Sequence, residues 1–357
     1  MKKTGSVYLP LHRGKIPPYL FSLMKNLGRE IVLQIIERYG TEEFLRRLSH
    51  PVWFQSLGCL LGFDWHSSGL TTATLSALKE AISPLSPDIG LFITGGKGEK
   101  GIETPKEIEY WSDKSGIDGE RLIYCSRMTA KVDNVALQDG YSIYQHFFTF
   151  DEKGRWVVIQ QGMNPSFSMA RRYHWIWEGL KSFIDEPHKG ICGKREKEVL
   201  NLVADESKEC RESIVNMLEE KNEILKFIHN ARNIKLPERH QIFWRNTDER
   251  RLEKVFLDII EKKVKDFETL IGIRGVGPVT VRALALICEI IEGKRPSYKD
   301  PVRYTFAHGG KDGHPFPVKR EVYIESINFL TEVLKNCKIP PLEKERKLKK
   351  LATLLPD

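Results

Sequence analysis

Seven polar side chains in the N-terminal half of the sequence are of the types that metal-dependent phosphodiester hydrolysis uses. They are Asp64, His66, Lys131, Asp133, Asp139, His146 and Gln160. Carboxylates bind Mg²⁺ or Mn²⁺, the metal activates a water for attack on phosphorus, and a lysine offsets the developing charge. The candidate metal ligands are Asp64, Asp133 and Asp139. His66 or His146 would ligate the metal or act as general base, and Lys131 would stabilise charge.

Each of these residues also has a structural interpretation, and no spacing signature joins the seven. In an extended segment Asp64 and His66 project to the same face, but an aspartate helix cap beside a hydrogen-bonded histidine fits them too. Lys131 and Asp133 share one face of an expected strand and could form a plain salt bridge. Asp139 precedes a glycine and could be only a turn residue. The sequence leaves both interpretations open.

The stretch GIRGVGPVTVRALALICEII, residues 272–291, places two glycines around one valine directly before an apolar helix. A helix N-terminus carries unpaired N–H groups and partial positive charge, and glycines let a phosphate approach them without a Cβ in the way. With a helix expected before it, the unit resembles the helix-hairpin-helix motif, a DNA-phosphate clamp without sequence specificity, although Val281 departs from its usual alanine. The DNA-binding candidates are Arg274, Gly275, Val276, Gly277, Thr280 and Arg282. The alternative is a buried helical hairpin with no ligand.

Arg171 and Arg172 stand next to Tyr173 and close to Trp175. Basic and aromatic side chains in this arrangement suit a nucleic-acid strand through phosphate contact and base stacking, but the aromatic residues fit a packed core equally well. Asp300 follows the glycine turn at roughly the distance of the catalytic aspartate in some DNA glycosylases. It could equally cap a helix.

The apolar periodicity predicts the elements that position these residues. Helices are predicted over residues 18–50 with a break at Gly40, from about Thr72, over 168–184, and as one or two charged helices within 194–233. Strands are predicted at 90–94, 121–133, 141–150 and 155–163. The last two form a hairpin through Asp151–Gly154, with Phe150 opposite Arg155. The rest of residues 84–120 is interpreted as connections.

The fold class that follows is an α+β N-terminal domain with a β-hairpin-containing sheet, and an all-α C-terminal domain containing the helix-hairpin-helix. The predicted boundaries are 1–190 for the candidate catalytic domain, 191–235 for a charged helical bridge, and 236–357 for the DNA-binding domain.

The composition indicates the partners and the compartment. Lys plus Arg number 56 against 48 Asp plus Glu, which gives a net charge of +8 and favours a polyanionic partner. The six cysteines include no C-x-x-C pair and no apolar run is long enough to span a membrane. We therefore expect a cytoplasmic protein with reduced thiols and no membrane partner. Plentiful Lys and Glu with sparse Gln are typical of a thermophile.

Several segments together are similar to one known family. They are FQSLGCLLGFDWHSSGLTT, AKVDNVALQDGY, VIQQGMN, ARRYHW, EPHKGI and DPVRYTFAHGGKDG. The family consists of archaeal and thermophilic bacterial proteins catalogued as a domain of unknown function, number seven hundred and sixty-three. The resemblance covers nearly the whole chain and implies an intracellular DNA-related role, with nuclease activity as one form of it. It assigns no role to any residue.

The first functional hypothesis is a DNA-binding, metal-dependent deoxyribonuclease of DNA repair or processing, with Mg²⁺ or Mn²⁺ as cofactor. The alternative is a non-catalytic DNA-binding adaptor in repair or replication. A third hypothesis is a base-excision glycosylase that uses Asp300. The sequence leaves open whether the DNA is single-stranded, duplex or branched, and what the oligomeric state is.

Overall fold

The computed structural model of the chain describes residues 16–62, 68–164, 168–218, 264–302 and 340–352, with Leu9, Ser166 and scattered positions within 255–262 and 328–336. At its centre is a five-stranded antiparallel sheet with the order β1-β3-β4-β5-β6. The strands are β1 (Leu91–Lys97), β3 (Ser142–Asp151), β4 (Trp156–Asn164), β5 (Met169–Ile176) and β6 (Gly190–Cys192). A second, two-stranded sheet pairs β2 (Leu137–Gln138) with β7 (Leu200–Asn201). The predicted mixed α+β class is confirmed.

The hairpin of β3 and β4 confirms the predicted pair of strands, but not its register. Phe150 pairs with Trp156 and not with Arg155. The reason lies in the loop, where the Asp151 carboxylate accepts hydrogen bonds from the backbone N–H groups of Lys153 and Arg155 at 3.0 and 3.1 Å. These bonds keep Arg155 in the turn, so the predicted register was wrong by one residue.

The corrected register decides which polar residues of the hairpin meet. His146 lies opposite Gln160, and Gln145 lies opposite Gln161. The register shifts just before Gln145, where Tyr144 is the extra residue of a β-bulge. Bulges of this kind turn a side chain to a new direction and are frequent beside functional sites.

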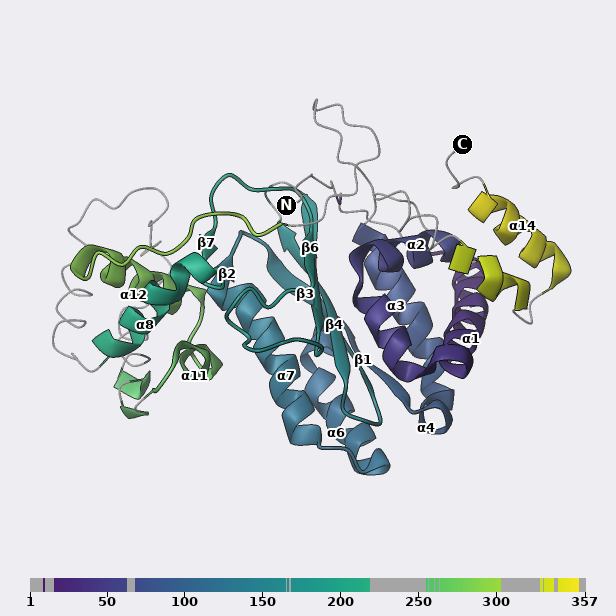
Figure 1. Cartoon of the computed structure of the whole chain (residues 1–357), viewed down its shortest axis with the longest axis horizontal. Helices are drawn as coiled ribbons and strands as arrows, with labels where there is room; N and C mark the ends of the chain where they lie inside the picture. Colours follow the sequence, from purple (N-terminus) through teal and green to yellow (C-terminus); the bar gives the residue numbers. More distant parts are fainter. Residues whose placement is uncertain are drawn as a thin grey trace.

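One face of the sheet is covered by the helices of the N-terminal segment (Figure 1). These are α1 (Pro18–Ser49), which is kinked at Gly40, α2 (Pro51–Leu61) and α3 (Ser68–Ile82). Their apolar stripes pack on the sheet residues Ile93, Phe147 and Ile159. The C-terminal helix α14 (Pro341–Ala352) returns to this layer, where the Lys347 ammonium donates to the Leu60 carbonyl at 2.9 Å.

The opposite face is covered by α6 (Thr104–Ser115) and α7 (Gly119–Lys131), which continues into a π-helical turn, η2 (Val132–Ala136). Phe92, Phe148 and Trp156 of the sheet face this layer. The same apolar cluster extends without a break into α8 (Lys208–Met217), α11 (Phe267–Gly272) and α12 (Pro278–Ile291). Shorter elements are η1 (Ser83–Leu85), α4 (Ser86–Ile89), α5 (Glu99–Ile102) and η3 (Asp205–Ser207). One core therefore joins the sheet to the helices beyond residue 236.

Two predicted elements were of the wrong type. Residues 121–133 form α7 and η2, not a strand; the Asp118 carboxylate caps α7 by accepting from the Arg121 N–H at 3.1 Å. Residues 169–176 form a strand, not a helix. Because helices cover both faces of this strand, all but its first residue are buried and its sequence does not alternate.

Two further predictions need correction. Residues 84–120 are more than connections around a strand, because α4, α5 and α6 lie within them. Of the charged segment 194–233, residues 200–201 are a strand and α8 is a helix, while residues 219–233 lie outside the described residues. Within the described part of the chain, no helix combines the length and apolar character that crossing a membrane requires.

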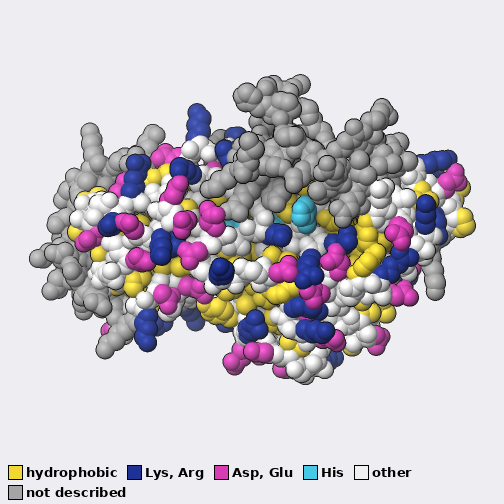
Figure 2. Space-filling model, in the orientation of Figure 1, with side chains coloured by type: hydrophobic (Ala, Val, Ile, Leu, Met, Phe, Trp, Pro, Cys, Tyr) yellow, Lys and Arg dark blue, Asp and Glu magenta, His cyan; other side chains and the backbone are white. Residues whose placement is uncertain are grey.

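Charged side chains of both signs are interspersed over the face of the molecule drawn in Figure 2. On this face the net positive charge is not gathered into one broad patch. On this face, a site for a polyanion has to be sought in local geometry.

Candidate functional site: the glycine turn and the polar network of the sheet

The turn between α11 and α12 presents its backbone to solvent. Arg274 and Gly275 are exposed, and Gly277 is half-buried. Gly275 has φ +97°, a left-handed conformation that glycine adopts without steric cost. Pro278 begins α12, and the N-cap residue is Gly277, which has no side chain to cap the first turn. The first N–H groups of a 14-residue helix thus lie at an accessible end, where partial positive charge favours an anion.

The inner side of the turn is fixed by the sheet domain. The Lys131 ammonium, at the end of α7, donates to the carbonyls of Val276 at 2.7 Å and Ile273 at 3.3 Å. The Gln138 side chain donates to the Pro278 carbonyl at 2.8 Å. Burial lowers the pKa of the Lys131 ammonium. Lys131, predicted to stabilise charge in hydrolysis, therefore contacts the inner side of the turn through two backbone carbonyls.

The remaining predicted DNA-binding residues of the turn have inner positions. Val276 and Thr280 are buried. Arg282 is half-buried, and its Nε donates to the Gln138 side-chain oxygen at 2.8 Å. Burial lowers the pKa of Arg282. Of the six predicted residues, Arg274 and Gly275 are exposed, and Gly277 and Arg282 are partly exposed.

Asp133 is fully buried, and both of its carboxylate oxygens are in use. Oδ2 accepts from the Gln160 amide and from the Trp175 indole N–H at 2.9 Å. Oδ1 contacts His188 Nε2 at 2.5 Å. These three contacts occupy most of the roughly four lone-pair sites of an ionised carboxylate and hold Asp133 in place inside the core.

His146 extends this network away from Asp133. Burial lowers the pKa of the His146 imidazole, which keeps the ring neutral. Its Nδ1 lies 2.7 Å from Gln160 Oε1, an acceptor, so Nδ1 carries the proton. Nε2 then accepts from the Ser126 hydroxyl at 2.9 Å. Three residues predicted from the sequence are thus brought together in a chain of hydrogen bonds, but they are buried.

Asp139 belongs to a second network on the same face. One oxygen accepts from the Tyr141 N–H at 3.0 Å, and the other from Arg171 at 2.8 Å and the Tyr173 hydroxyl at 2.7 Å. Burial raises the pKa of Asp139, and Arg171 opposes that shift. Arg171 also forms a salt bridge with Asp300 at 2.6 Å. The buried guanidinium therefore joins two carboxylates.

Asp300 is fixed in place by further bonds. Its carboxylate accepts from the backbone N–H groups of Glu196 at 2.6 Å and Val302 at 3.0 Å, in addition to Arg171. These bonds attach the segment that follows α12 to the sheet. Asp300 thus has a full set of structural partners and presents no free oxygen to a substrate.

Asp133 and Asp139 do not form a common site for Mg²⁺ or Mn²⁺. Asp133 and Asp139 lie in separate networks with both oxygens occupied. Among the described residues, no group of three or more His, Cys, Asp or Glu side chains is arranged to hold a metal ion. Asp64 and His66 lie outside the described residues.

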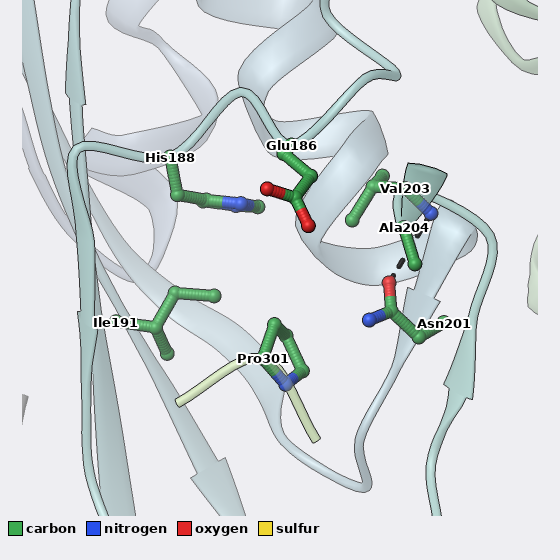
Figure 3. A pocket seen from close by; sticks show the side chains of 7 residues that line it. All are labelled: Glu186, His188, Ile191, Asn201, Val203, Ala204 and Pro301. Carbon is green, nitrogen blue, oxygen red and sulfur yellow. Dashed lines mark hydrogen bonds between the residues drawn. The ribbon is translucent and has the colours of Figure 1, made fainter. Parts of the chain in front are cut away.

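A small pocket opens beside the Asp133 network (Figure 3). It is lined by Glu186, His188, Ile191, Asn201, Val203, Ala204 and Pro301. The His188 ring and the Glu186 carboxylate point toward one another in it. Its volume of about 20 Å³ is room for about one water molecule. The pocket can hold a water beside the Asp133–His188 pair, but not a nucleotide.

The sequence reasoning missed the partners of Asp133. His188 and Trp175 are both far from it along the chain. The sequence of 169–176 shows no polar–apolar alternation that would mark it as a strand. Once it is taken as a strand, the side chains of Arg171, Tyr173 and Trp175 fall on one face. Arg172 falls on the other face and is fully buried against α1–α3. Neither arginine presents its guanidinium to a DNA strand at the surface.

The networks and the turn lie in a region that one family model covers. The model, described as "Protein of unknown function (DUF763)", matches residues 5–318. The chain belongs to this family. The match covers the sheet, both of its helical layers up to α12, and Asp300. Comparison with curated proteins gave no match, and neither did comparison with solved structures.

Proposed function

We propose that this DUF763 protein binds DNA through the sugar-phosphate backbone at the turn between α11 and α12. The observation that carries the proposal is the division of the turn into two sides. The carbonyls of Ile273, Val276 and Pro278 are bonded inward, to Lys131 and Gln138. The outward side holds two glycines and the N-terminus of α12.

Phosphate contact at such a turn is independent of base sequence. A helix N-terminus offers N–H donors and partial positive charge, and the missing Cβ atoms leave room for a phosphate oxygen. Arg274 adds an exposed guanidinium on the same turn. The features are those of the helix-hairpin-helix motif that the sequence resembles.

The hydrogen bonds of Asp133, Asp139 and Asp300 argue against a catalytic role for these three carboxylates. Each carboxylate accepts hydrogen bonds on both of its oxygens. We therefore favour the non-catalytic DNA-binding function, and place it above a metal-dependent nuclease that uses Asp133 and Asp139. A glycosylase that uses Asp300 has the least support, because its carboxylate is paired with Arg171.

The test compares two glycine variants by fluorescence anisotropy with labelled single-stranded, duplex and branched DNA. Gly277 has an extended backbone that alanine tolerates, and a Cβ there meets nothing within 4 Å. Gly277→Ala should fold normally but place a methyl group where the phosphate approaches. We expect DNA affinity to fall about tenfold, which is about 1.4 kcal/mol.

The matched control is Gly272→Ala, whose new methyl group meets only the flexible end of Met128 at 3.4 Å. It should bind like the wild type. Wild-type affinity should also fall steeply with salt, because phosphate contacts release counterions. Equal affinity of Gly277→Ala and wild type, or binding without salt dependence, contradicts the proposal.

A parallel incubation with Mg²⁺ or Mn²⁺, and with EDTA, tests the nuclease hypothesis. We expect the DNA to stay uncut. Metal-dependent cleavage that disappears in a folded Asp133→Asn protein would return the catalytic role to that carboxylate.

A further inference from the structure

A second polar cluster lies on the opposite face of the sheet. Gln145 pairs with Gln161 across β3 and β4, and Gln161 pairs with Arg172 across β4 and β5, so the three side chains form one row. The β-bulge turns Tyr144 to the same side, where its hydroxyl contacts the Gln161 amide. We call these four residues, together with Thr72, the Gln145 cluster.

The Gln145 cluster contacts the first turn of α3, a 15-residue helix. The Thr72 hydroxyl donates to Gln145 Oε1. Gln161 Nε2 donates to the Ser68 carbonyl at 3.0 Å. Three strands thus bring their polar side chains to the end of α3 where the helix dipole is positive.

Two polar atoms of the cluster are buried without a partner. Gln145 is 1% exposed and Gln161 is 0% exposed. Among the residues that the structure describes, Gln145 Nε2 and Gln161 Oε1 make no hydrogen bond. Buried polar atoms are nearly always paired, because an unpaired one loses its hydration without compensation. The amide of Gln145 is held against α3 by Thr72, so its free N–H₂ group is directed at the same helix end.

The cluster also contains a buried positive charge without a carboxylate. Arg172 is fully buried and donates to neutral acceptors, His174 Nε2 at 2.8 Å and Gln55 Oε1 at 3.1 Å. No salt bridge to Arg172 occurs within the described ranges of the chain. Burial and the charge of Arg172 hold the pKa of His174 well below its usual value, so this ring stays neutral. On the solvent side, the exposed Lys97 ammonium lies 5.6 Å from the centre of the Tyr144 ring.

We propose that the Gln145 cluster binds a phosphate group at the N-terminus of α3. Adjacent strands are about 4.8 Å apart, so an anion above Gln161 is within reach of side chains from both neighbouring strands. An inorganic phosphate ion at neutral pH has ionised oxygens, which accept from Gln145, and a hydroxyl, which donates to Gln161. Its negative charge lies close to Arg172 and at the positive end of α3.

The cluster is most accessible at its edge near Lys97. Thr72 and Tyr144 are partly accessible, and Lys97 is exposed. The Gln145 cluster and the turn between α11 and α12 share no residue, so the phosphate site and the DNA clamp can be tested independently.

The experiment is isothermal titration of the full-length protein with inorganic phosphate at fixed ionic strength. Wild type should bind one phosphate in a saturable way. Gln145→Glu places a carboxylate in the site and should abolish the binding. Gln145→Met removes only the amide and should weaken it about tenfold, the effect of one lost hydrogen bond to a charged group.

Gln34→Glu makes the same change of charge in α1, where the Gln34 amide donates to the Glu37 carboxylate, and should bind phosphate like the wild type. Thermal unfolding without phosphate establishes that each variant is folded. If Gln145→Glu fails to fold, Gln145→Met decides the question. Wild-type affinity in folded Gln145 variants overturns the proposal, and so does absence of saturable binding by the wild type both in this titration and in the one that follows.

A second titration identifies the source of the phosphate. It compares short single-stranded DNA with a 5′-phosphate and with a 5′-hydroxyl. A higher affinity for the phosphorylated end, lost in Gln145→Glu, assigns the site to a nucleic-acid terminus. Equal affinity for the two ends, together with binding of inorganic phosphate, assigns it to the free ion. Either result supports a phosphate site, and failure of both titrations rejects it.

Discussion

Replacing Lys131 by methionine tests whether its ammonium group stabilises the turn or contacts DNA. Lys131→Met keeps the length of the side chain and deletes the donor to Val276 at 2.7 Å and Ile273 at 3.3 Å. A hydrogen bond from a charged donor contributes about 1.5–3 kcal/mol, and the longer contact adds less. Desolvation of the half-buried ammonium offsets part of this. We therefore expect the free energy of unfolding to fall by about 2 kcal/mol, measured by urea denaturation.

The same variant should leave the number of phosphate contacts unchanged, because Lys131 faces carbonyls and not the solvent side of the turn. The slope of log K against log salt should equal that of the wild type. Arg274→Gln removes the same charge from the exposed side. Its stability should stay within about 0.5 kcal/mol of wild type, and its slope should fall by about 0.9.

Two results would refute this reasoning. A reduced salt slope in Lys131→Met would mean that the ammonium reaches a phosphate. Unchanged stability would mean that the turn does not depend on the two hydrogen bonds. In either case the inner and outer sides of the turn would have to be reassigned.

Three further predictions concern the buried networks and the turn. Arg171→Met leaves two buried carboxylates without their shared cation and should cost about 3–5 kcal/mol of unfolding free energy in urea denaturation; a loss below 1 kcal/mol would contradict the network. Burial lowers the pKa of His146 from its usual 6.5, so the unfolded chain takes up the proton first and stability is lost as the pH falls below that value. His146→Gln should therefore reduce the acid-induced loss by up to about 1.4 kcal/mol per pH unit, measured between pH 7 and 5, and an unchanged pH profile argues against a buried neutral ring. Gly275→Ala forces alanine to φ +97° and should lower the melting temperature through a cost of about 1–2 kcal/mol, since a Cβ there makes only an ordinary 3.5 Å contact with Val255.

The sequence was sufficient to predict those elements whose structure is determined by residues within the element itself. The β3–β4 hairpin and the glycine turn before α12 were both predictable, because turn residues and flanking apolar runs specify them within a few positions. The register of the β3–β4 hairpin was harder to predict from the sequence. It depended on the side chain of Asp151, which bonds two N–H groups of its own loop.

Elements whose type depends on distant packing were not predictable in the same way. The segment 169–176 contains arginines and a histidine in the core, a pattern that indicates a strand only when both covering layers are known. Residues 121–131 contain aromatic and β-branched side chains, and become a helix because one stripe packs between the sheet and α6. Propensity is a weak prior in such cases, and tertiary contacts decide.

The candidate site shows the same division. Asp133 was predicted as a metal ligand or as a salt-bridge partner of Lys131, but its contact with His188 joins residues 55 positions apart. Lys131 was assigned to catalysis, and it instead supports a turn that begins more than 140 residues later. Residue types alone do not reveal whether a carboxylate faces a ligand or a set of internal donors.

The continuous apolar cluster of the sheet, α7, α8, α11 and α12 makes the glycine turn and the sheet a single thermodynamic unit. A ligand that binds only the folded chain stabilises everything that unfolds with its site. DNA at the glycine turn should therefore raise the melting temperature of the sheet as well, and tryptophan fluorescence from Trp156 or Trp175 would report the occupancy of a site to which neither belongs. Conversely, if the proposed DNA binding is correct, a substitution that loosens the sheet core should weaken it even though the substituted residue makes no contact with DNA.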